Sequence, residues 1–362
     1  MAISGGTELN AVRTVEQLVS RGHSVITATL TSATDGMTQR YEAAGSRVMR
    51  FPVTGLVGYN AVTQVRRVAE MLRQERVDIV HTHDCFTNFL MVPAARLAGV
   101  PVVASKRWIR HVVSKYRYTD LVAFGLADRI LANSEAVART LVDEDYVASS
   151  KISVVHNFID PDYFSARDSR DMWRTRFGFS DQDLVVGIVA QLREEKNHAV
   201  LIDAFARLVS IVPAARLLVV GDGPERARIE TLVSSSGLGT CVVLAGHVPR
   251  AGLCYAAADV AVLPSQHEGF PNSVVEAMAV GVPVVGSNVG GIPDAIVAGE
   301  TGYLVPVGDS DALCKRLAEL LSDATLRRRM SAAGRQRALD RYQAASALST
   351  LEQLYAALHP SP

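Results

Sequence analysis

Short runs rich in valine, isoleucine and leucine alternate with longer amphipathic stretches along most of this 362-residue chain. In the first half the runs are SVITATL, VDIVHTH, VPVVAS and RILANS. The pattern starts again after residue 180 with DLVVGIVAQL, ARLLVVGDG, CVVLAGH, DVAVLPS and VPVVGSN. Apolar strands separated by helices are typical of a parallel sheet covered by helices on both faces. The sequence therefore predicts two α/β domains in series.

The polar segment HNFIDPDYFSARDSR breaks both periodicities, and we place a hinge within residues 157–172. We expect a Rossmann-like, doubly wound domain over residues 1–160 and a second over residues 161–340. A C-terminal helix over residues 341–362 should pack back toward the first domain, and ligand should bind in a cleft between the domains. Only MAIS precedes Gly5, so the strand that normally opens such a domain is missing, and we expect the true start upstream.

Composition narrows the class of protein. The 37 Lys and Arg residues balance 37 Asp and Glu residues, which argues against nucleic acid as the partner. The four cysteines lie far apart without Cys-x-x-Cys spacing, so neither a metal site nor a disulfide framework is expected, and a reducing cytoplasm fits best. No stretch reaches the ~20 apolar residues of a membrane span. We predict a cytoplasmic protein that needs no metal and no cofactor.

The stretch KRWIRHVVSKYR, residues 106–117, contains five Lys or Arg residues and no acid. Such a stretch attracts anionic lipid, which predicts peripheral contact with the inner face of the cytoplasmic membrane. The alternative is an ordinary solvated helix face.

Two glutamates flank a turn in HEGFPNSVVEAM, residues 267–278. With Asn272 or Ser273 opening a helix, the backbone of Gly269, Phe270, Pro271 and Asn272 lies at a helix N-terminus, where free N–H groups bind anions. Glu268 precedes the turn, and Glu276 is expected in the first turn of the helix. Since carboxylates only accept hydrogen bonds, this arrangement suits a ligand with hydroxyls on both sides of a diphosphate, as in a nucleotide sugar. Alternatively, Glu276 is a helix-start signal and Glu268 a solvated charge.

The segment HEGFPNSVVEAMAVGVPVVGSNVGGIPDAI resembles the signature region of the family 4 retaining glycosyltransferases, with its Glu-x7-Glu motif and following Gly-Gly loop. Further similar segments are GGTELNAVRTVEQLVSRGHSV, VDIVHTHD, ADRILANSEAV, RLLVVGDGPERARIETL and LAGHVP. Together they extend from Gly5 to about Arg337. The resemblance implies a GT-B fold and sugar transfer, without metal and with retention of configuration, from a nucleotide sugar to a growing envelope glycan or its lipid carrier. UDP-linked donors are preferred over GDP-linked ones.

The resemblance also implies roles for single residues. Lys196 and Arg193 would stabilise the leaving diphosphate, and His247 would touch the nucleotide base. Glu268 would hold sugar hydroxyls and Glu276 the ribose. The alternatives are a solvated ion-paired turn for Lys196 and Arg193, and a capped strand end for His247.

Glycines and unusual residues complete the expected site. Gly5 and Gly6 allow close approach of backbone to the diphosphate or acceptor, or simply make a turn. On the acceptor side we name His83, Lys106, Arg107 and Ser134, although a histidine at a strand end is more often structural. Relatives commonly carry a histidine where VVASKRW has Lys106 and Arg107, and an arginine where this chain has Gln191. The missing histidine suggests either a charged acceptor or a subfamily with basic residues at this place. Two other functions stay open: a nucleotide-sugar epimerase, and a non-catalytic nucleotide-sugar-binding protein, which both departures and the missing first strand make conceivable.

Overall fold

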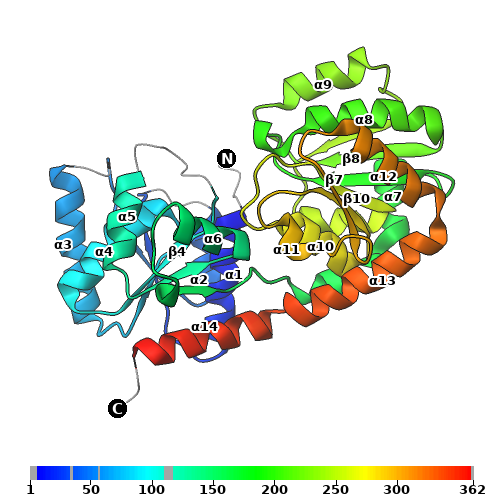
Figure 1. Cartoon of the computed structure of the whole chain (residues 1–362). Coiled ribbons are helices and arrows are strands. Elements are labelled where there is room, and N and C mark those ends of the chain that lie inside the picture. Colours follow the sequence, from blue (N-terminus) through cyan, green and yellow to red (C-terminus); the bar gives the residue numbers. More distant parts are fainter. Residues whose placement is uncertain (1–5, 33–35, 56–57, 110–116, 360–362) are drawn as a thin grey trace. The chain divides into compact units, whose positions relative to one another are not determined.

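The computed structural model describes residues 6–32, 36–55, 58–109 and 117–359. The chain divides into two compact units (Figure 1). Unit 1 comprises residues 1–158 and 344–362, and unit 2 comprises residues 159–343. The domain limits expected from the sequence were residues 160 and 340.

Unit 1 has parallel strands in two sheets. The smaller sheet pairs β1 (Ile26–Thr29) with β2 (Arg47–Arg50). The larger has the order β3 (Val80–His81), β4 (Val102–Lys106), β5 (Arg129–Ala132) and β6 (Ile152–Val154). The described part of unit 1 begins with helix α1 (Gly6–Ser20), and the prediction of a missing opening strand falls on residues outside those described.

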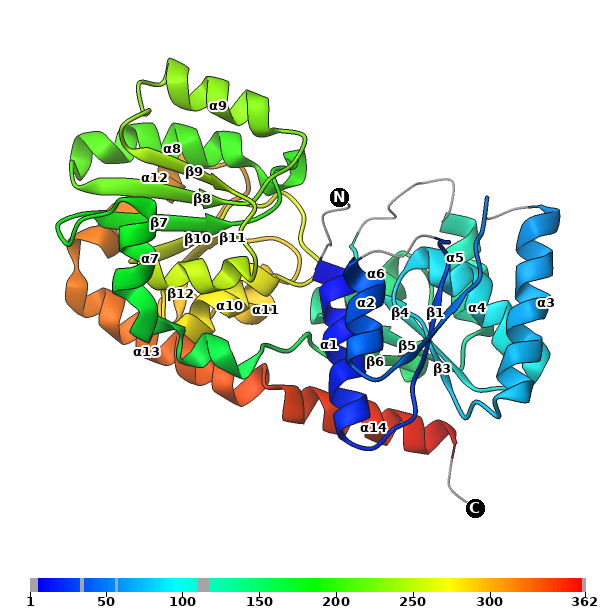
Figure 2. The same ribbon diagram turned by 180° about the vertical axis from the view of Figure 1, so that it is seen from behind.

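Helices cover the larger sheet of unit 1 on both faces. Its helices besides α1 are α2 (Gly36–Ala43), α3 (Tyr59–Gln74), α4 (Cys85–Ala98), α5 (Arg117–Leu126), α6 (Glu135–Asp143) and α14 (Ala344–Leu358). Successive side chains of a strand point to opposite faces. Val102 and Ala104 accordingly join a core with α3, α4 and α5, whereas Val103 packs with α1 and α14. Figure 2 shows α14 alongside α1.

Unit 2 contains one parallel sheet of six strands. Its order is β12 (Gly302–Val305), β11 (Val284–Ser287), β10 (Val260–Leu263), β7 (Leu184–Val189), β8 (Ala215–Val220) and β9 (Val242–Gly246). The apolar runs of the second half therefore form parallel strands, as the sequence predicts. The chain winds outward from β7 in one direction to β9, and then from β10 in the other to β12.

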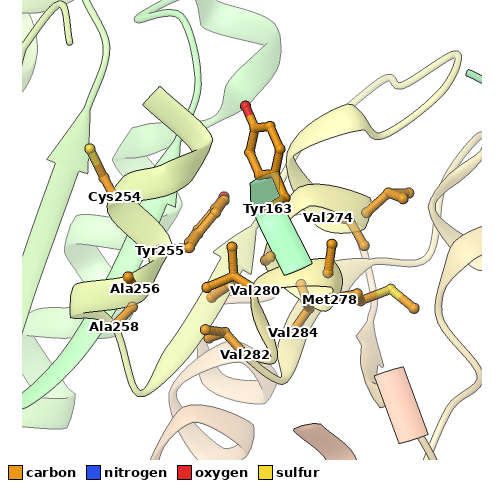
Figure 3. Packing of buried hydrophobic residues seen from close by; sticks show 14 of the residues in the cluster. Tyr163, Cys254, Tyr255, Ala256, Ala258, Val274, Met278, Val280, Val282 and Val284 are labelled. Carbon is orange, nitrogen blue, oxygen red and sulfur yellow. The ribbon is translucent and has the colours of Figure 1, made fainter. Parts of the chain in front are cut away.

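Two apolar cores lie on the two faces of this sheet. Val186 and Ile188 of β7 pack with α8 (His198–Ile211), α9 (Arg226–Ser235) and α12 (Ser310–Ser322). Val185 packs on the other face with α7 (Arg170–Phe177), α10 (Asn272–Val280), α11 (Ile292–Ala295) and the end of α13 (Ala324–Arg341). Figure 3 shows part of that second core, where Tyr255 and Met278 lie among small side chains. Both faces of the sheet are thus buried, which leaves the strand ends to bind ligand.

Among the described residues, we find no helix whose length and apolarity would allow it to cross a membrane.

Candidate active site

The strand order of unit 2 reverses between β7 and β10, its two central strands. In open parallel sheets, ligands bind at the carboxyl ends of the strands where the order reverses. The segments leaving these strands are residues 190–197 and 264–272, and they are joined by a hydrogen bond of 2.8 Å from Gln266 N to Glu195 O. Both segments contain residues that the sequence singled out, so the topology brings the predicted site together.

Lys196 and Glu268 form an ion pair across this point. Lys196 Nζ donates to Glu268 Oε2 at 2.6 Å, and Ser265 Oγ donates to the same oxygen at 3.3 Å. The side chains are 21% and 13% exposed, so solvent screens the pair only in part. Gly291 N donates to Glu268 O at 3.0 Å, which brings the Gly-Gly loop after β11 to the same place. Glu268 is therefore held by both its side chain and its backbone.

Arg193 lies beside this pair and is more open. Its side chain is 46% exposed, and its Nη1 atom is 3.9 Å from Glu195 Oε1, a loose ion pair. It lines a small hollow of about 80 Å³. The other residues around the hollow come from the loop after β7, from α8, from α9 and its N-cap, and from the loop after β10. They are Glu194, Asn197, His198, Ala199, Glu225, Arg228, Ile229, Leu232 and Gln266.

Helix α10 begins at Asn272, with Pro271 as its N-cap, and no side chain caps it. Val274 N and Val275 N donate to Pro271 O. Glu276 is the fifth residue of α10, so the expectation that it lies in the first turn is wrong. A Cβ atom on Gly252 would lie 2.5 Å from Glu276 Oε2, so the absence of a side chain at residue 252 leaves room for this carboxylate.

The side chain of Phe270 belongs to the core of unit 2. It is 5% exposed and packs edge-on against the ring of Tyr342, with 5.7 Å between ring centroids. Pro271 is buried as well. These two residues can offer only their backbone to a ligand, because their side chains belong to the core. The sequence did not reveal that these side chains point into the core, because both lie in a turn between the polar residues Glu268 and Asn272.

His198, the first residue of α8, was not singled out from the sequence. Its ring lies against the hollow, is 4% exposed, and has no hydrogen-bond partner on either nitrogen among the described residues. Burial, and then the nearby charge of Lys196, lower the pKa of His198 to about 4, so the ring is neutral at pH 7. A histidine at the start of an apolar helix is typical of a core residue, so the sequence pattern did not indicate that His198 lies at the candidate site.

Glycines allow the loop after β7 to lie against the loop after β8. Gly221 has φ 142°, and a Cβ atom there would lie 1.9 Å from Ala190 O. Gly223 has φ 159°, with 2.5 Å to Leu192 O. Leu192 N donates to Asp222 O at 3.0 Å. The Gly-Asp-Gly turn thus positions the segment that carries Arg193.

Three further donor-site predictions concern separate places. His247 is exposed directly after β9. Gly6 begins α1 in unit 1, and Gly5 lies outside the described residues. Within the described ranges, no group of three or more His, Cys, Asp and Glu side chains could hold a metal ion.

In unit 1 the structure brings together only two of the four residues named on the acceptor side. Arg107 Nη2 lies 3.1 Å from His83 Nδ1. Lys106 is buried on the opposite face of β4, where Nζ pairs with Asp145. Ser134 is fully buried and caps α6, since its hydroxyl accepts from Val137 N at 3.1 Å. Lys106 and Ser134 are therefore structural residues in this fold.

The burial of Lys106 and Arg107 removes two of the five basic residues from the predicted membrane-facing stretch at residues 106–117, and the prediction of membrane contact itself stays untested. Both residues are 7% exposed, so they offer no charge to a lipid surface. Trp108 is 46% exposed, and residues 110–116 lie outside the described ranges.

A doubly wound parallel sheet with a Lys-Glu pair, an exposed arginine and a helix start where its strand order reverses is typical of nucleotide-binding α/β proteins. Residues 169–337 match the model of the glycosyl transferases group 1, and residues 4–163 match that of glycosyltransferase family 4. A D-inositol 3-phosphate glycosyltransferase of Thermobifida fusca is 30% identical over 370 residues, covering 91% of this chain and 84% of that protein. The chain belongs to glycosyltransferase family 4 and is a transferase.

Other similar proteins agree with this assignment. The N-acetyl-α-D-glucosaminyl L-malate synthase of Bacillus anthracis is 29% identical over 360 residues, covering 97% of this chain and 92% of that protein. The crystal structure of HepE from Anabaena in complex with UDP has a TM-score of 0.86 and 21% identity, covering 98% of this chain and 97% of that chain. This likeness confirms the predicted GT-B fold, with two Rossmann-like domains.

Proposed function

We propose that this protein transfers a sugar from a UDP-linked donor to a glycan or lipid-linked acceptor, with retention of anomeric configuration and without a metal ion. The observation that carries the proposal is the Lys196–Glu268 ion pair at the reversal point of the unit 2 sheet. It places a cation for a diphosphate next to a carboxylate for sugar hydroxyls.

The leaving diphosphate is assigned to Lys196, Arg193 and the backbone at the start of α10. Two cationic side chains and a helix N-terminus supply the positive field that a leaving diphosphate requires. Arg193 is exposed enough to turn toward such a ligand, because its ion pair with Glu195 is loose, with 3.9 Å between the charged atoms. Because the chain itself provides this charge, no metal is needed for the role.

The hydroxyls of the donor are assigned to the two carboxylates. Glu268 is held by Lys196, Ser265 and the backbone of Gly291, so it is fixed before the donor arrives. Glu276 lies beside Gly252, in a space that a side chain would close. Each carboxylate accepts from two neighbouring hydroxyls, as on a sugar ring or a ribose.

The nucleotide base and the acceptor are assigned from similar proteins. UDP is preferred because the similar HepE structure contains it. The names of relatives include transfer to diphosphoundecaprenol-linked GlcNAc as well as synthesis of a glucosaminyl malate, so the acceptor class varies in the family. The cytoplasm remains the expected compartment, because all four cysteines are free.

The test is release of nucleoside diphosphate from UDP-, GDP- and ADP-sugars, with a membrane extract as acceptor source. We expect release from a UDP-sugar that depends on the extract, survives EDTA, and disappears in Lys196→Ala and Glu276→Ala. Lys315→Ala, which removes an exposed lysine of α12, is the matched control and should keep full activity.

The outcomes separate the competing functions. Conversion of the donor sugar to an epimer without an acceptor would establish the epimerase, and donor binding with no release would establish the binding protein. The anomeric proton coupling of the glycosylated product, measured by NMR, tests retention. An inverted product overturns that part of the proposal.

A further inference from the structure

Arg107 lies at the carboxyl end of β4 in unit 1, and its guanidinium is buried among uncharged groups. Nη1 donates to Asn10 Oδ1 at 2.7 Å and to Asn157 Oδ1 at 2.9 Å. Nη2 lies 3.1 Å from His83 Nδ1. Burial, followed by the charges of His81 and Arg107, lowers the pKa of His83 well below its usual value, so this imidazole is neutral at pH 7.

The charge of Arg107 has no carboxylate partner among the described residues. Burial lowers the pKa of Arg107 to about 10, and Asp84 acts against this effect from a distance. The Oδ1 atom of Asp84 accepts instead from Thr87 N at 2.7 Å, as the cap of α4. Proteins normally pair a buried charge because removing an ion from water is costly. Arg107 therefore keeps a positive charge that its surroundings do not balance.

Among the described residues, the two other buried cations each have a carboxylate partner, which makes Arg107 an exception. Lys106, its neighbour in sequence, meets Asp145 on the other face of β4. Arg174 of unit 2, as deeply buried, has Asp259 Oδ2 at 3.4 Å. Arg107, by contrast, contacts only two amide oxygens and a neutral imidazole. Its positive charge is therefore available to an anionic ligand.

The Nε atom of Arg107 shows where a partner belongs. It is buried and has no hydrogen-bond partner among the described residues, while Nη1 already donates twice. Nη2 carries a second hydrogen beyond the one directed at His83. The edge formed by Nε and Nη2 is one that carboxylates and phosphates take in two parallel hydrogen bonds. Asn10 and Asn157 hold the guanidinium from the Nη1 side and so fix that edge in place.

We propose that the Nε–Nη2 edge of Arg107 binds a carboxylate or phosphate group carried by one of the two substrates. That the bound group belongs to a substrate rests on the proposed function. The oxyanion site itself is argued from residues of unit 1 alone. Arg107 is then a specificity-determining residue: it favours an acidic sugar or acceptor over the neutral compound of the same shape. The rival view is that Arg107 only links α1 and β6 to β4 through the two asparagines.

The test is thermal denaturation of the full-length protein with matched pairs of small compounds at constant ionic strength. The pairs are glucuronate with glucose, and glycerol 3-phosphate with glycerol. We expect at least one oxyanion to raise Tm and its neutral partner to leave Tm unchanged, because ligand bound only to the folded state stabilises it. Indifference to both oxyanions overturns the proposal.

Variants then assign the effect to the guanidinium edge. Arg107→Met should abolish the response, and Arg107→Lys should weaken oxyanion binding about tenfold or more, because one of two charge-assisted bonds is lost. Arg96→Met removes a half-exposed arginine of α4 in the same unit and should respond like the wild type. Should Arg107→Met not fold, Arg107→Lys still tests the proposal. If Arg107 only links the surrounding elements, oxyanion binding should be the same in Arg107→Lys as in the wild type.

Donor titrations identify which substrate carries the oxyanion. Tighter binding of UDP-glucuronate than of UDP-glucose, lost in Arg107→Lys, places it on the donor sugar. Equal binding of both donors, together with stabilisation by a free oxyanion, places it on the acceptor. Failure of UDP itself to bind would refute the proposed function, while an Arg107-dependent oxyanion response would persist.

Discussion

The Nζ atom of Lys196 lies 2.6 Å from Oε2 of Glu268, although the two residues are 72 positions apart in the chain. Lys196 follows β7 and Glu268 follows β10, the two central strands between which the strand order of the unit 2 sheet reverses. One contact therefore links the residue proposed for the diphosphate with the residue proposed for the sugar.

A double-mutant cycle tests whether the pair acts as a unit. We expect Lys196→Met and Glu268→Gln each to lower kcat by about 100-fold, since each removes a preorganised group from the reacting centre. The double variant should lose little more than either single variant, because residues in direct contact are not additive. The measurement is nucleoside diphosphate release. Losses that multiply to about 10⁴-fold would show that the two residues act independently.

Gly252 controls the position of Glu276. A Cβ atom at residue 252 would lie 2.5 Å from both Glu276 Oε2 and Tyr163 Cε1. We expect Gly252→Ala to raise the KM for the donor several-fold and to lower kcat less, because the carboxylate must move. Steady-state kinetics check this. Gly239→Ala is the control, since a Cβ atom there meets nothing within 4 Å. An unchanged KM would remove Glu276 from the donor site.

The stability of unit 1 should fall in mild acid because of His81. Its Nδ1 atom lies 2.7 Å from Tyr355 Oη and its Nε2 atom 2.9 Å from Ser105 Oγ. Burial, and then Arg107, lower the pKa of His81 to about 3 from 6.5. The unfolded chain thus binds one more proton between these values. The stabilisation is complete above pH 6.5 and is lost toward pH 3, at about 1.4 kcal/mol per pH unit.

Urea titrations at pH 7 and pH 5 measure this effect. Trp108 and Trp173 are the two tryptophans of the chain. In a Trp173→Phe background, the fluorescence of Trp108 follows unit 1 alone. His81→Gln should show the smaller loss of stability between the two pH values. An equal loss in both proteins would mean that His81 is not the titrating group.

The sequence predicted the strands well and the directions of single side chains poorly. Runs such as DLVVGIV are apolar on both faces, which only a covered parallel sheet requires. The meeting of Lys196 and Glu268 was predictable because carboxyl ends of parallel strands share an edge. The sequence did not show that Lys106 and Arg107 point to opposite faces of the sheet, because both are charged and the strand was expected to end at Ser105. β4 continues through Lys106, so its alternation sends the two side chains to opposite faces.

Phe270 shows the same limit in a turn. Its neighbours Glu268 and Asn272 point to a ligand site, yet its ring packs on Tyr342, a residue from the end of α13. No spacing rule within one segment reveals a partner 72 positions downstream. The partners Asp145 and Tyr342 are tertiary information, and they decide which of the predicted residues can face a ligand.

The Lys106–Asp145 pair gives a final prediction about stability. Its side chains are 6% and 0% exposed, and removal of one buried partner leaves the other charge uncompensated. We expect Asp145→Asn to lower the free energy of unfolding of unit 1 by about 3–5 kcal/mol. The double variant with Lys106→Met should recover most of that loss. Glu42→Gln, which removes the half-exposed partner of Arg50, is the control and should change little. Urea titration with Trp108 fluorescence in the Trp173→Phe background provides the values. No recovery in the double variant would mean that Asp145 stabilises unit 1 through other contacts than Lys106.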